Sequence, residues 1–384
     1  MARRKFFIPV LFLVTALAAL VFVLKVKDEM VDFEVNYQAA QRLRLGETLY
    51  RTADGHYQFK YLPFSAFLYL PLATLPLPAA KAVWFSLVLV SIILIFSIAF
   101  KLIGESPKKR LILVGLTFLI MGRYFLRELQ LGQINALITL ILMLMIQRME
   151  ADKPQRLGKK FVESGALWGL ATALKPYAAV FLPYFVLKRR WRSLAFGLGA
   201  LFLAVLAPSL FYGLKGNFQV LGEWKSSLSA STPFLLGTQD NVSIIGFLVK
   251  RTSNQSLSLV IYLIVLILLA GFVFFLVARG RSCPRPVILE GFLLLSLIPL
   301  ISPLGWDYTL LSAAPMTMLL LANFGKFPWI GRLLLCCNWA VIALSLYDLL
   351  GKELYARFMS WSVITVDFFV VIGCLAFLRI KGHA

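Results

Sequence analysis

Polar side chains that could take part in catalysis are grouped in a few short segments between long apolar runs. These segments contain carboxylates, cations and amides together with one tryptophan. The candidate residues are Asp32, Glu34, Arg127, Glu128, Gln133, Asn135, Lys175, Asp240, Asn241, Ser243, Trp306 and Asp307. A carboxylate can take the proton from an attacking hydroxyl, and an Arg or Lys can stabilise a phosphate that gains charge as it departs. This set of groups suits the transfer of a sugar from a phosphate-bearing lipid.

Other kinds of chemistry have less support in the sequence. The chain has two histidines, one of them (His383) beside the C-terminus, and its four cysteines show no metal-ligand spacing and no disulfide framework. A G-x-x-x-x-G-K-[ST] loop is absent, which makes a nucleotide-linked sugar a less natural donor. Asp32 and Glu34 are two residues apart. We therefore predict no cofactor and leave open a divalent cation shared by these two carboxylates.

The apolar runs indicate the elements that hold these residues. Hydrophobic residues make up 60% of the 384-residue chain and its mean hydropathy is +0.83, whereas soluble proteins are roughly 45–50% apolar. Runs of this length require lipid around them. We predict an all-α fold, a polytopic transmembrane helical bundle with about 10–12 transmembrane helices, in which residues 1–384 form a single membrane-embedded domain.

Basic residues predict which ends of these helices face the cytoplasm. The formal net charge is +21, but Lys and Arg occur in short clusters between apolar runs, as in cytoplasmic loops, and no basic-aromatic groove pattern supports a nucleic-acid partner. The clusters include Arg3–Lys5, Lys108–Arg110, Lys188–Arg190 and the pair Arg379 and Lys381. Both termini are therefore predicted to be cytoplasmic. Residues 6–24, after the first cluster, favour an uncleaved anchor over a signal peptide.

Two longer polar segments are predicted on the outer side. Residues 25–80 form the first, where apolar residues at four-residue spacing within Val31–Leu45 predict an amphipathic helix on the membrane surface and prolines divide the rest into short pieces. Residues 213–255 form the second. Two apolar runs within residues 161–187 are short for spans that need about 20 residues, which favours short or re-entrant helices.

With this topology, the candidate residues converge on one side of the membrane, but each also has a structural interpretation. Arg127 and Glu128 could form an interfacial ion pair, and Lys175 could extend to the surface. Gln133 and Asn135 could hydrogen-bond between helices. Asp32 could decorate a solvated helix face, and Trp306 and Tyr308 could belong to an aromatic belt. An ordinary loop could account for Asp240, Asn241 and Ser243. A transporter or lipid flippase would instead need charges through the midplane and often repeated halves, and a non-catalytic scaffold would leave the polar segments without a role.

The order of several short motifs resembles glycosyltransferase family 87. The resemblance extends from about Asp32 to Pro315, and the motifs in order are Asp32–Tyr37, Gly46–Tyr50, Tyr61–Pro63, Gly132–Asn135, Ala173–Pro176, Arg189–Trp191, Asn241–Ser243 with Gly246, and Ser302–Pro303 with Trp306. Each motif alone is weak, whereas their order and spacing together are specific.

This resemblance implies a GT-C fold, a polyprenyl-phosphate sugar as donor, transfer of mannose with inversion, a lipid or glycan acceptor, and a bacterial inner membrane. It also implies an aspartate base in the first outer loop, which by position is Asp32. Lys175 and Arg127 become candidates for the donor phosphate, and Gln133, Asn135 and Trp306 for the sugar pocket. Many family members carry a histidine where Asp307 stands here, which puts the role of that segment in question.

Overall fold

The computed structural model describes residues 19–151, 160–252, 254–278 and 283–382. Within them the chain is helical and contains no strand, apart from an isolated bridge between Asn241 and Trp306. The predicted all-α class is therefore confirmed. Most of the predicted N-terminal anchor lies outside the described residues.

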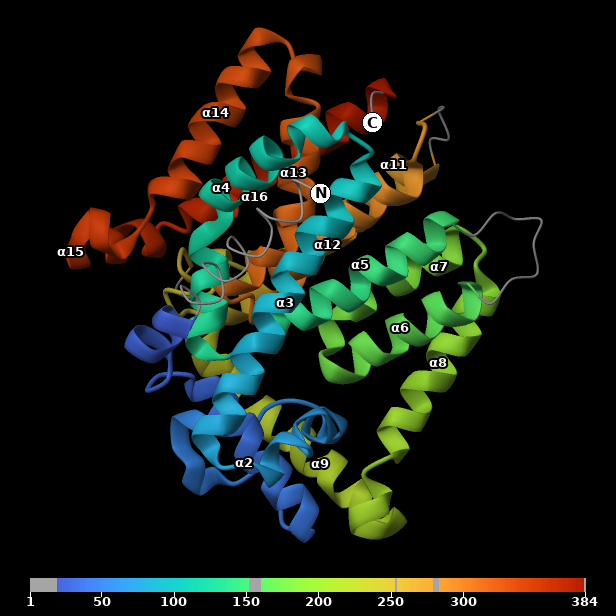
Figure 1. Cartoon of the computed structure of the whole chain (residues 1–384), viewed down its shortest axis with the longest axis vertical. Helices are drawn as coiled ribbons and strands as arrows, with labels where there is room; N and C mark the ends of the chain where they lie inside the picture. The colour runs from blue at the N-terminus through green and yellow to red at the C-terminus, as the bar shows by residue number, and fades with distance from the viewer. Residues whose placement is uncertain (1–18, 152–159, 253, 279–282, 383–384) are drawn as a thin grey trace, which may run out of the picture.

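The helices follow the apolar runs closely (Figure 1). The α-helices are α2 (Val31–Leu45), α3 (Leu77–Ile103), α4 (Arg110–Leu131), α5 (Asn135–Ala151), α6 (Lys160–Leu174), α7 (Leu182–Leu187), α8 (Trp191–Leu206), α9 (Ser209–Leu235), α10 (Ile244–Val249), α11 (Gln255–Ala278), α12 (Pro286–Ile301), α13 (Ala314–Ala322), α14 (Trp329–Leu344), α15 (Tyr347–Ser360) and α16 (Val363–Lys381). A π-helical turn, η1 (Phe22–Val26), precedes them, and 3-10 turns include η2 (Thr52–Tyr57), η3 (Pro63–Tyr69), η4 (Leu72–Thr74), η5 (Pro107–Lys109), η6 (Pro176–Phe181), η7 (Asp307–Ala313) and η8 (Phe324–Lys326).

Several of these helices are apolar and long enough to cross a bilayer. Among the described residues α3, α11 and α16 qualify singly, and three further pairs qualify together but are bent, by 120° between α4 and α5, 91° between α8 and α9, and 99° between α14 and α15. Shorter apolar helices are Pro176–Leu187, Pro286–Ile301 and Asp307–Ala322. The chain is an integral membrane protein, and the count of 10–12 crossings stays a prediction.

Glycines bring α6 and α8 into close contact. A Cβ atom at Gly165 would lie 2.1 Å from the Ser193 carbonyl oxygen, and one at Gly169 would lie 2.3 Å from that of Gly197. Small residues allow helix backbones to approach in this way inside a membrane. The short helix α6 is thereby held by protein on one side, as a short apolar helix requires.

Helix α2 has the predicted bounds but packs differently from the prediction. Its inner face, which includes Phe33, Ala39 and Leu43, is fully buried against the protein, and its neighbours include η3 and η4. This face therefore packs against protein and not against lipid, whereas the predicted position of the helix at the membrane surface stays a prediction. The prolines of residues 63–78 produce short 3-10 turns that fold back over the helix and cover it.

The second predicted outer loop is mostly helical. Residues 213–255 include most of α9 and all of α10, and Gly213, at a positive φ of 66°, interrupts the helical backbone near the start of α9. In Figure 1 α9 and α2 lie at the same end of the molecule, beyond the end of α3. These helices form a layer over one end of the apolar helices (Figure 1).

Basic residues gather at the opposite ends of the helices. Arg190, after α7, donates to the Met149 carbonyl oxygen near the end of α5 at 2.9 Å, and Arg285, before α12, donates to the Leu102 carbonyl oxygen at the end of α3 at 2.6 Å. Each arginine thus bonds to a carbonyl oxygen near the C-terminal end of another helix, where carbonyl groups lack partners within the helix. The chain thus separates its basic clusters from its candidate catalytic residues.

Candidate active site

The position of Asp32 is set by contacts between the start of α2 and the turn that follows α4. The Met30 amide donates to the Gln130 carbonyl oxygen at 2.9 Å, and Trp84 Nε1 donates to the Gly132 carbonyl oxygen at 2.8 Å. Gly132 has a φ of +69°, and a Cβ there would lie 2.7 Å from Phe33 Cβ. A glycine is required at this position both for the left-handed turn and for the close approach of α2.

This approach brings Asp32 to Gln133. Gln133 Nε2 donates to Asp32 Oδ2 at 2.7 Å and lies 3.1 Å from the Tyr308 hydroxyl. The other carboxylate oxygen, Oδ1, accepts no hydrogen bond from the described chain and belongs to a half-buried residue. Asp32 therefore has one oxygen held in place and one available to a proton from a ligand.

Burial raises the pKa of Asp32 above its ordinary value, and the Gln133 hydrogen bond and the positive charges of Lys175 and Arg127 oppose that rise. A higher pKa makes a carboxylate a stronger base, provided that it is still ionised at neutral pH. The two cations maintain the ionised form, which suits the predicted role of Asp32 in removing a proton.

Lys175 lies at the other end of the same network. Its Nζ donates to Asn135 Oδ1 at 2.7 Å and lies 3.4 Å from Gln133 Oε1. The ammonium group also lies 5.0 Å and 5.6 Å from the ring centres of Tyr61 and Tyr177. Lys175 is 8% exposed, so it does not extend to the surface. Gln133 and Asn135 hold the Lys175 ammonium group near the carboxylate of Asp32. Their side chains therefore join this network and do not simply link two helices.

Glu128 hydrogen-bonds to this network through Asn135. Its Oε1 accepts a hydrogen bond from the Ala136 amide at 2.7 Å and its Oε2 accepts one from Asn135 Nδ2 at 2.8 Å. The side chain is fully buried and occupies the N-terminus of α5, where a carboxylate is favourable. We assign Glu128 to positioning Asn135, in place of the predicted contact with substrate. It makes no ion pair with Arg127.

Glu34 and Arg127 have partners of their own. Lys81 Nζ lies 2.6 Å from Glu34 Oε1 and also donates to the Lys27 carbonyl oxygen. Glu34 is thus directed to α3 and away from Asp32, so the pair does not share one site. Arg127 lies 3.6 Å from Asp240 Oδ2, and both side chains are more than 40% exposed. Arg127 remains free to turn toward a ligand.

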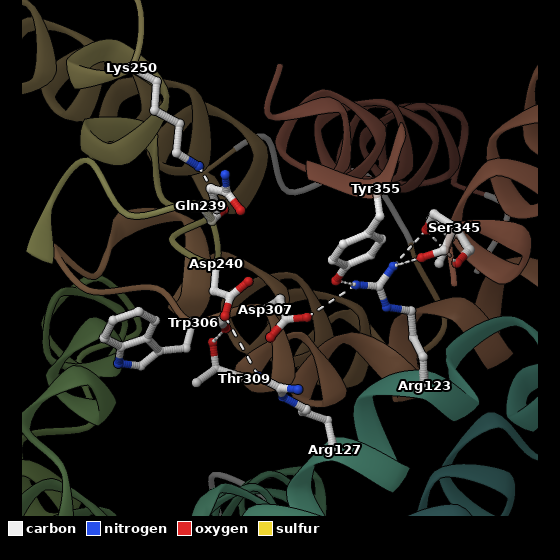
Figure 2. Close-up of polar contacts among 11 residues, drawn as sticks. Arg123, Arg127, Gln239, Asp240, Lys250, Trp306, Asp307, Thr309, Ser345 and Tyr355 are labelled. Atoms are coloured by element: carbon white, nitrogen blue, oxygen red, sulfur yellow. Dashed lines mark hydrogen bonds and ion pairs between the residues drawn. The ribbon is translucent and has the colours of Figure 1, made fainter. Parts of the chain in front are cut away.

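Asp307 is paired with Arg123, a residue that the sequence analysis did not single out (Figure 2). Arg123 Nη2 lies 3.1 Å from Asp307 Oδ2 and 3.0 Å from the Tyr355 hydroxyl, and Nη1 donates to both the carbonyl oxygen and the hydroxyl of Ser345. Arg123 lies one turn before Arg127 on α4. An arginine inside an apolar run, rare because of its cost, was the available signal.

Asn241 joins two segments of chain. Its Nδ2 donates to the carbonyl oxygens of Leu236 and Pro303, both at 3.0 Å, and its Oδ1 accepts from the amides of Ser243 and Gly305, both at 3.1 Å. Because these bonds occupy a fully buried side chain, we assign Asn241 to positioning and not to the predicted contact with substrate.

Comparison with known proteins decides the family. The profile described as Glycosyltransferase family 87 matches residues 59–303, more than half of the chain. The chain belongs to this family. The predicted resemblance is confirmed, and the protein is a glycosyltransferase.

One curated relative covers nearly all of this family 87 chain. It is a polyprenol-phosphate-mannose-dependent alpha-(1-2)-phosphatidylinositol pentamannoside mannosyltransferase from Mycolicibacterium smegmatis (strain ATCC 700084 / mc(2)155), 24% identical over 410 residues that span 99% of this chain and 93% of the relative. Two similar solved structures are of ArnT from Cupriavidus metallidurans. The apo form has a TM-score of 0.45 with 12% identity, covering 99% of this chain and 78% of ArnT. The undecaprenyl phosphate complex has a TM-score of 0.42 with 12% identity, covering 97% and 75%.

Two motifs of this family 87 chain now have a physical basis. In Asn241–Ser243 with Gly246, Ser243 Oγ accepts from the Gly246 amide at 3.0 Å and begins α10. A Cβ at Gly246 would lie 2.8 Å from the Asn241 side chain. In Gly132–Asn135, the glycine admits α2 and the two amides connect Asp32 to Lys175. These motifs thus position the polar network that contains Asp32 and Lys175.

Proposed function

We propose that this glycosyltransferase moves a hexose, with mannose as the first choice, from a polyprenyl-phosphate donor to a hydroxyl of a lipid or glycan acceptor. The observation that carries the proposal is the network in which Gln133 contacts both Asp32, at 2.7 Å, and Lys175, at 3.4 Å. A base and a cation are thereby held on the two sides of a shared amide. The donor named in the curated relative supports the same choice.

The proposed reaction is one displacement with inversion. The acceptor oxygen attacks the anomeric carbon and its proton passes to Asp32 Oδ1. The bond between that carbon and the phosphate oxygen breaks, and its electron pair stays on the departing polyprenyl phosphate. Lys175 stabilises this added negative charge in a water-poor site. Gln133 and Asn135 keep the two charged groups apart and oriented.

We place the site on the extracytoplasmic face of a bacterial inner membrane, with both termini in the cytoplasm. The separation of basic clusters from the catalytic network, one at each end of the helices, supports this orientation because cytoplasmic loops are rich in Lys and Arg. A polyprenyl-phosphate sugar presents its headgroup at a membrane surface, where Asp32 and Lys175 could reach it.

The test is to incubate the purified protein with polyprenyl-phosphate mannose and candidate lipid or glycan acceptors, and to follow loss of the lipid-linked sugar. We expect Asp32→Asn to lower the transfer rate by at least about 100-fold, since general bases contribute roughly 10²–10⁴, while the melting temperature is kept. Asp28→Asn, an exposed carboxylate in the preceding segment, is the matched control.

Transfer by Asp32→Asn at the wild-type rate would move the base elsewhere. Consumption of no polyprenyl-phosphate hexose by the wild type would contradict the proposed reaction and favour transport, for which flux across proteoliposomes would be measured next.

A further inference from the structure

Two carboxylates lie side by side because two distant segments pair. The Val242 amide donates to the Gly305 carbonyl oxygen at 2.7 Å, and the Asp307 amide donates to the Asp240 carbonyl oxygen at 3.0 Å. Lys250 Nζ, which donates to the carbonyl oxygens of Gln239 and Asn241 at 2.8 Å each, stabilises the first segment. Asp240 and Asp307 are thus fixed as neighbours by backbone contacts (Figure 2).

Asp307 has one oxygen without a partner. Oδ2 is held by Arg123, whereas Oδ1 is buried and accepts no hydrogen bond within the described residues. The residue is 5% exposed. Leaving a buried acceptor unsatisfied costs free energy, so such groups usually indicate strain or a missing ligand. A hydroxyl group that reached Oδ1 would remove this cost.

The groups next to Asp307 are free to rearrange. Arg127 and Asp240 are 3.6 Å apart and 45% and 42% exposed, and exposed pairs of this kind contribute only about 0–1 kcal/mol. Trp306, half-buried, directly precedes Asp307 in the chain and is drawn beside Asp240 in Figure 2. An aromatic side chain next to carboxylates offers an apolar ring and hydrogen-bond acceptors together, the combination that a sugar ring can use.

The balance of charge favours a neutral ligand. Two carboxylates, Asp240 and Asp307, face two guanidinium groups, Arg123 and Arg127, in the pairs already described. An added phosphate or ammonium group would meet charges of both signs and would gain little over water. Hydroxyl groups can instead donate to the carboxylates and accept from Arg127.

This cluster adjoins the proposed base. Tyr308, the residue after Asp307, lies 3.1 Å from Gln133 Nε2, which in turn donates to Asp32. Arg127 lies close enough for its charge to act on both Asp32 and Asp307. Lys175 contacts the far side of the Gln133 amide. Lys175, the proposed contact of the donor phosphate, and the cluster therefore lie on different sides of the Gln133 amide.

We propose that Asp240, Asp307, Arg127 and Trp306 form the acceptor subsite, and that it binds a neutral polyhydroxylated ring such as a terminal sugar of a glycolipid or glycan. This inference rests on the proposed function and names its acceptor class. Arg123 is a positioning residue that holds Asp307 through its bonds to Ser345 and Tyr355.

The test measures binding of methyl α-mannopyranoside, a neutral probe, to the full chain in nanodiscs by saturation-transfer NMR, with mannose 6-phosphate and glucosamine as charged comparators. We expect the neutral probe to bind most tightly and Asp240→Asn to weaken it by about fivefold or more. Asp307→Asn should weaken it further, with circular dichroism as a check of folding. Glu353→Gln, an exposed carboxylate on α15, is the control and should bind as the wild type does.

Donor consumption without acceptor, by slow transfer to water, separates this inference from the proposed function. Glu353→Gln should leave that reaction unchanged and Asp32→Asn should abolish it, so the proposed function is judged from these two variants. Tighter binding of either charged comparator, or neutral binding that Asp240→Asn does not affect, would overturn the acceptor subsite even if donor consumption were normal. Loss of donor consumption in Asp240→Asn would assign the cluster to the donor instead.

Discussion

At the scale of single residues, the site depends on how one aspartate is kept both basic and ionised. Desolvation raises the pKa of Asp32, and Gln133, Lys175 and Arg127 act in the opposite direction. Since the base must be ionised to accept a proton, the rate of transfer should fall as the pH drops through this pKa. The acid side of the pH profile is therefore expected above the ordinary range of an aspartate, which is near 4.

Arg127→Gln tests this electrostatic balance. Removing a positive charge that favours the ionised carboxylate raises the pKa of Asp32 further, so the acid limb of the rate profile should move to higher pH. The measurement is the initial transfer rate from pH 4 to pH 9 for the wild type and the variant. An unchanged limb would show that Arg127 turns away from Asp32 in the working enzyme.

Lys175→Met tests the cation of the site. We expect kcat/KM for the polyprenyl-phosphate donor to fall by about 100-fold, as when one electrostatic donor to a developing anion is removed. Lys215→Met, at an exposed lysine on α9, should leave kcat/KM unaltered. If Lys175→Met kept the wild-type kcat/KM for the donor, stabilisation of the phosphate would be assigned to another group.

At the scale of elements, the bend between α4 and α5 creates the site. Gly132 allows a bend of 120° between the two helices, and Glu128 accepts a hydrogen bond from the Ala136 amide at the start of α5. The turn carries Gln133 and Asn135, both of them buried. The polar side chains thus face the loops that follow α6 and α12, where Lys175 and Tyr308 are found.

The crossing of α6 and α8 can be tested with two glycines. Gly169→Val should destabilise the protein by about 2 kcal/mol or more, because the added side chain would meet the backbone of α8, and overpacking typically costs 1–3 kcal/mol. Gly199→Ala lies on α8 where a Cβ meets nothing within 4 Å and is the control. Thermal unfolding in detergent gives both values. Equal melting temperatures would show that α6 and α8 separate more easily than their packing indicates.

At the scale of the whole molecule, a buried ionic cluster joins the helices at the basic end. Glu290 on α12 is 1% exposed, and its carboxylate contacts Lys188 at 2.9 Å, Arg379 at 3.1 Å and the Tyr184 hydroxyl at 3.0 Å. The cluster connects α7, α12 and α16 far from the catalytic network. It is expected to hold the bundle together without contributing to the reaction.

Glu290→Ala should therefore lower stability while the surviving folded protein keeps its donor KM. Removing one member of a buried ionic group typically costs about 3–5 kcal/mol, whereas Glu353→Ala on exposed α15 should change stability by less than about 1 kcal/mol. Chemical unfolding monitored by circular dichroism gives the free energies. A small effect at Glu290 would indicate that water reaches the cluster.

The sequence by itself determined the membrane class, the all-α fold and the family. Val31–Leu45 is a helix as predicted, and the roles of Asp32 as base and Lys175 as cation stay predictions. These features are local, since hydropathy, helical spacing, prolines and motif order depend on residues close in the chain.

Only the tertiary structure decided which polar residues act together. Asp32 meets Gln133 across 101 positions, and Glu34, two residues away, turns instead to Lys81. Asn241 and Glu128 became positioning residues, and Arg123, which looked like part of an apolar run, became the partner of Asp307. Spacing along a helix gives the face on which a side chain lies, but the partner of that face is set by how helices cross and where glycines allow them to approach.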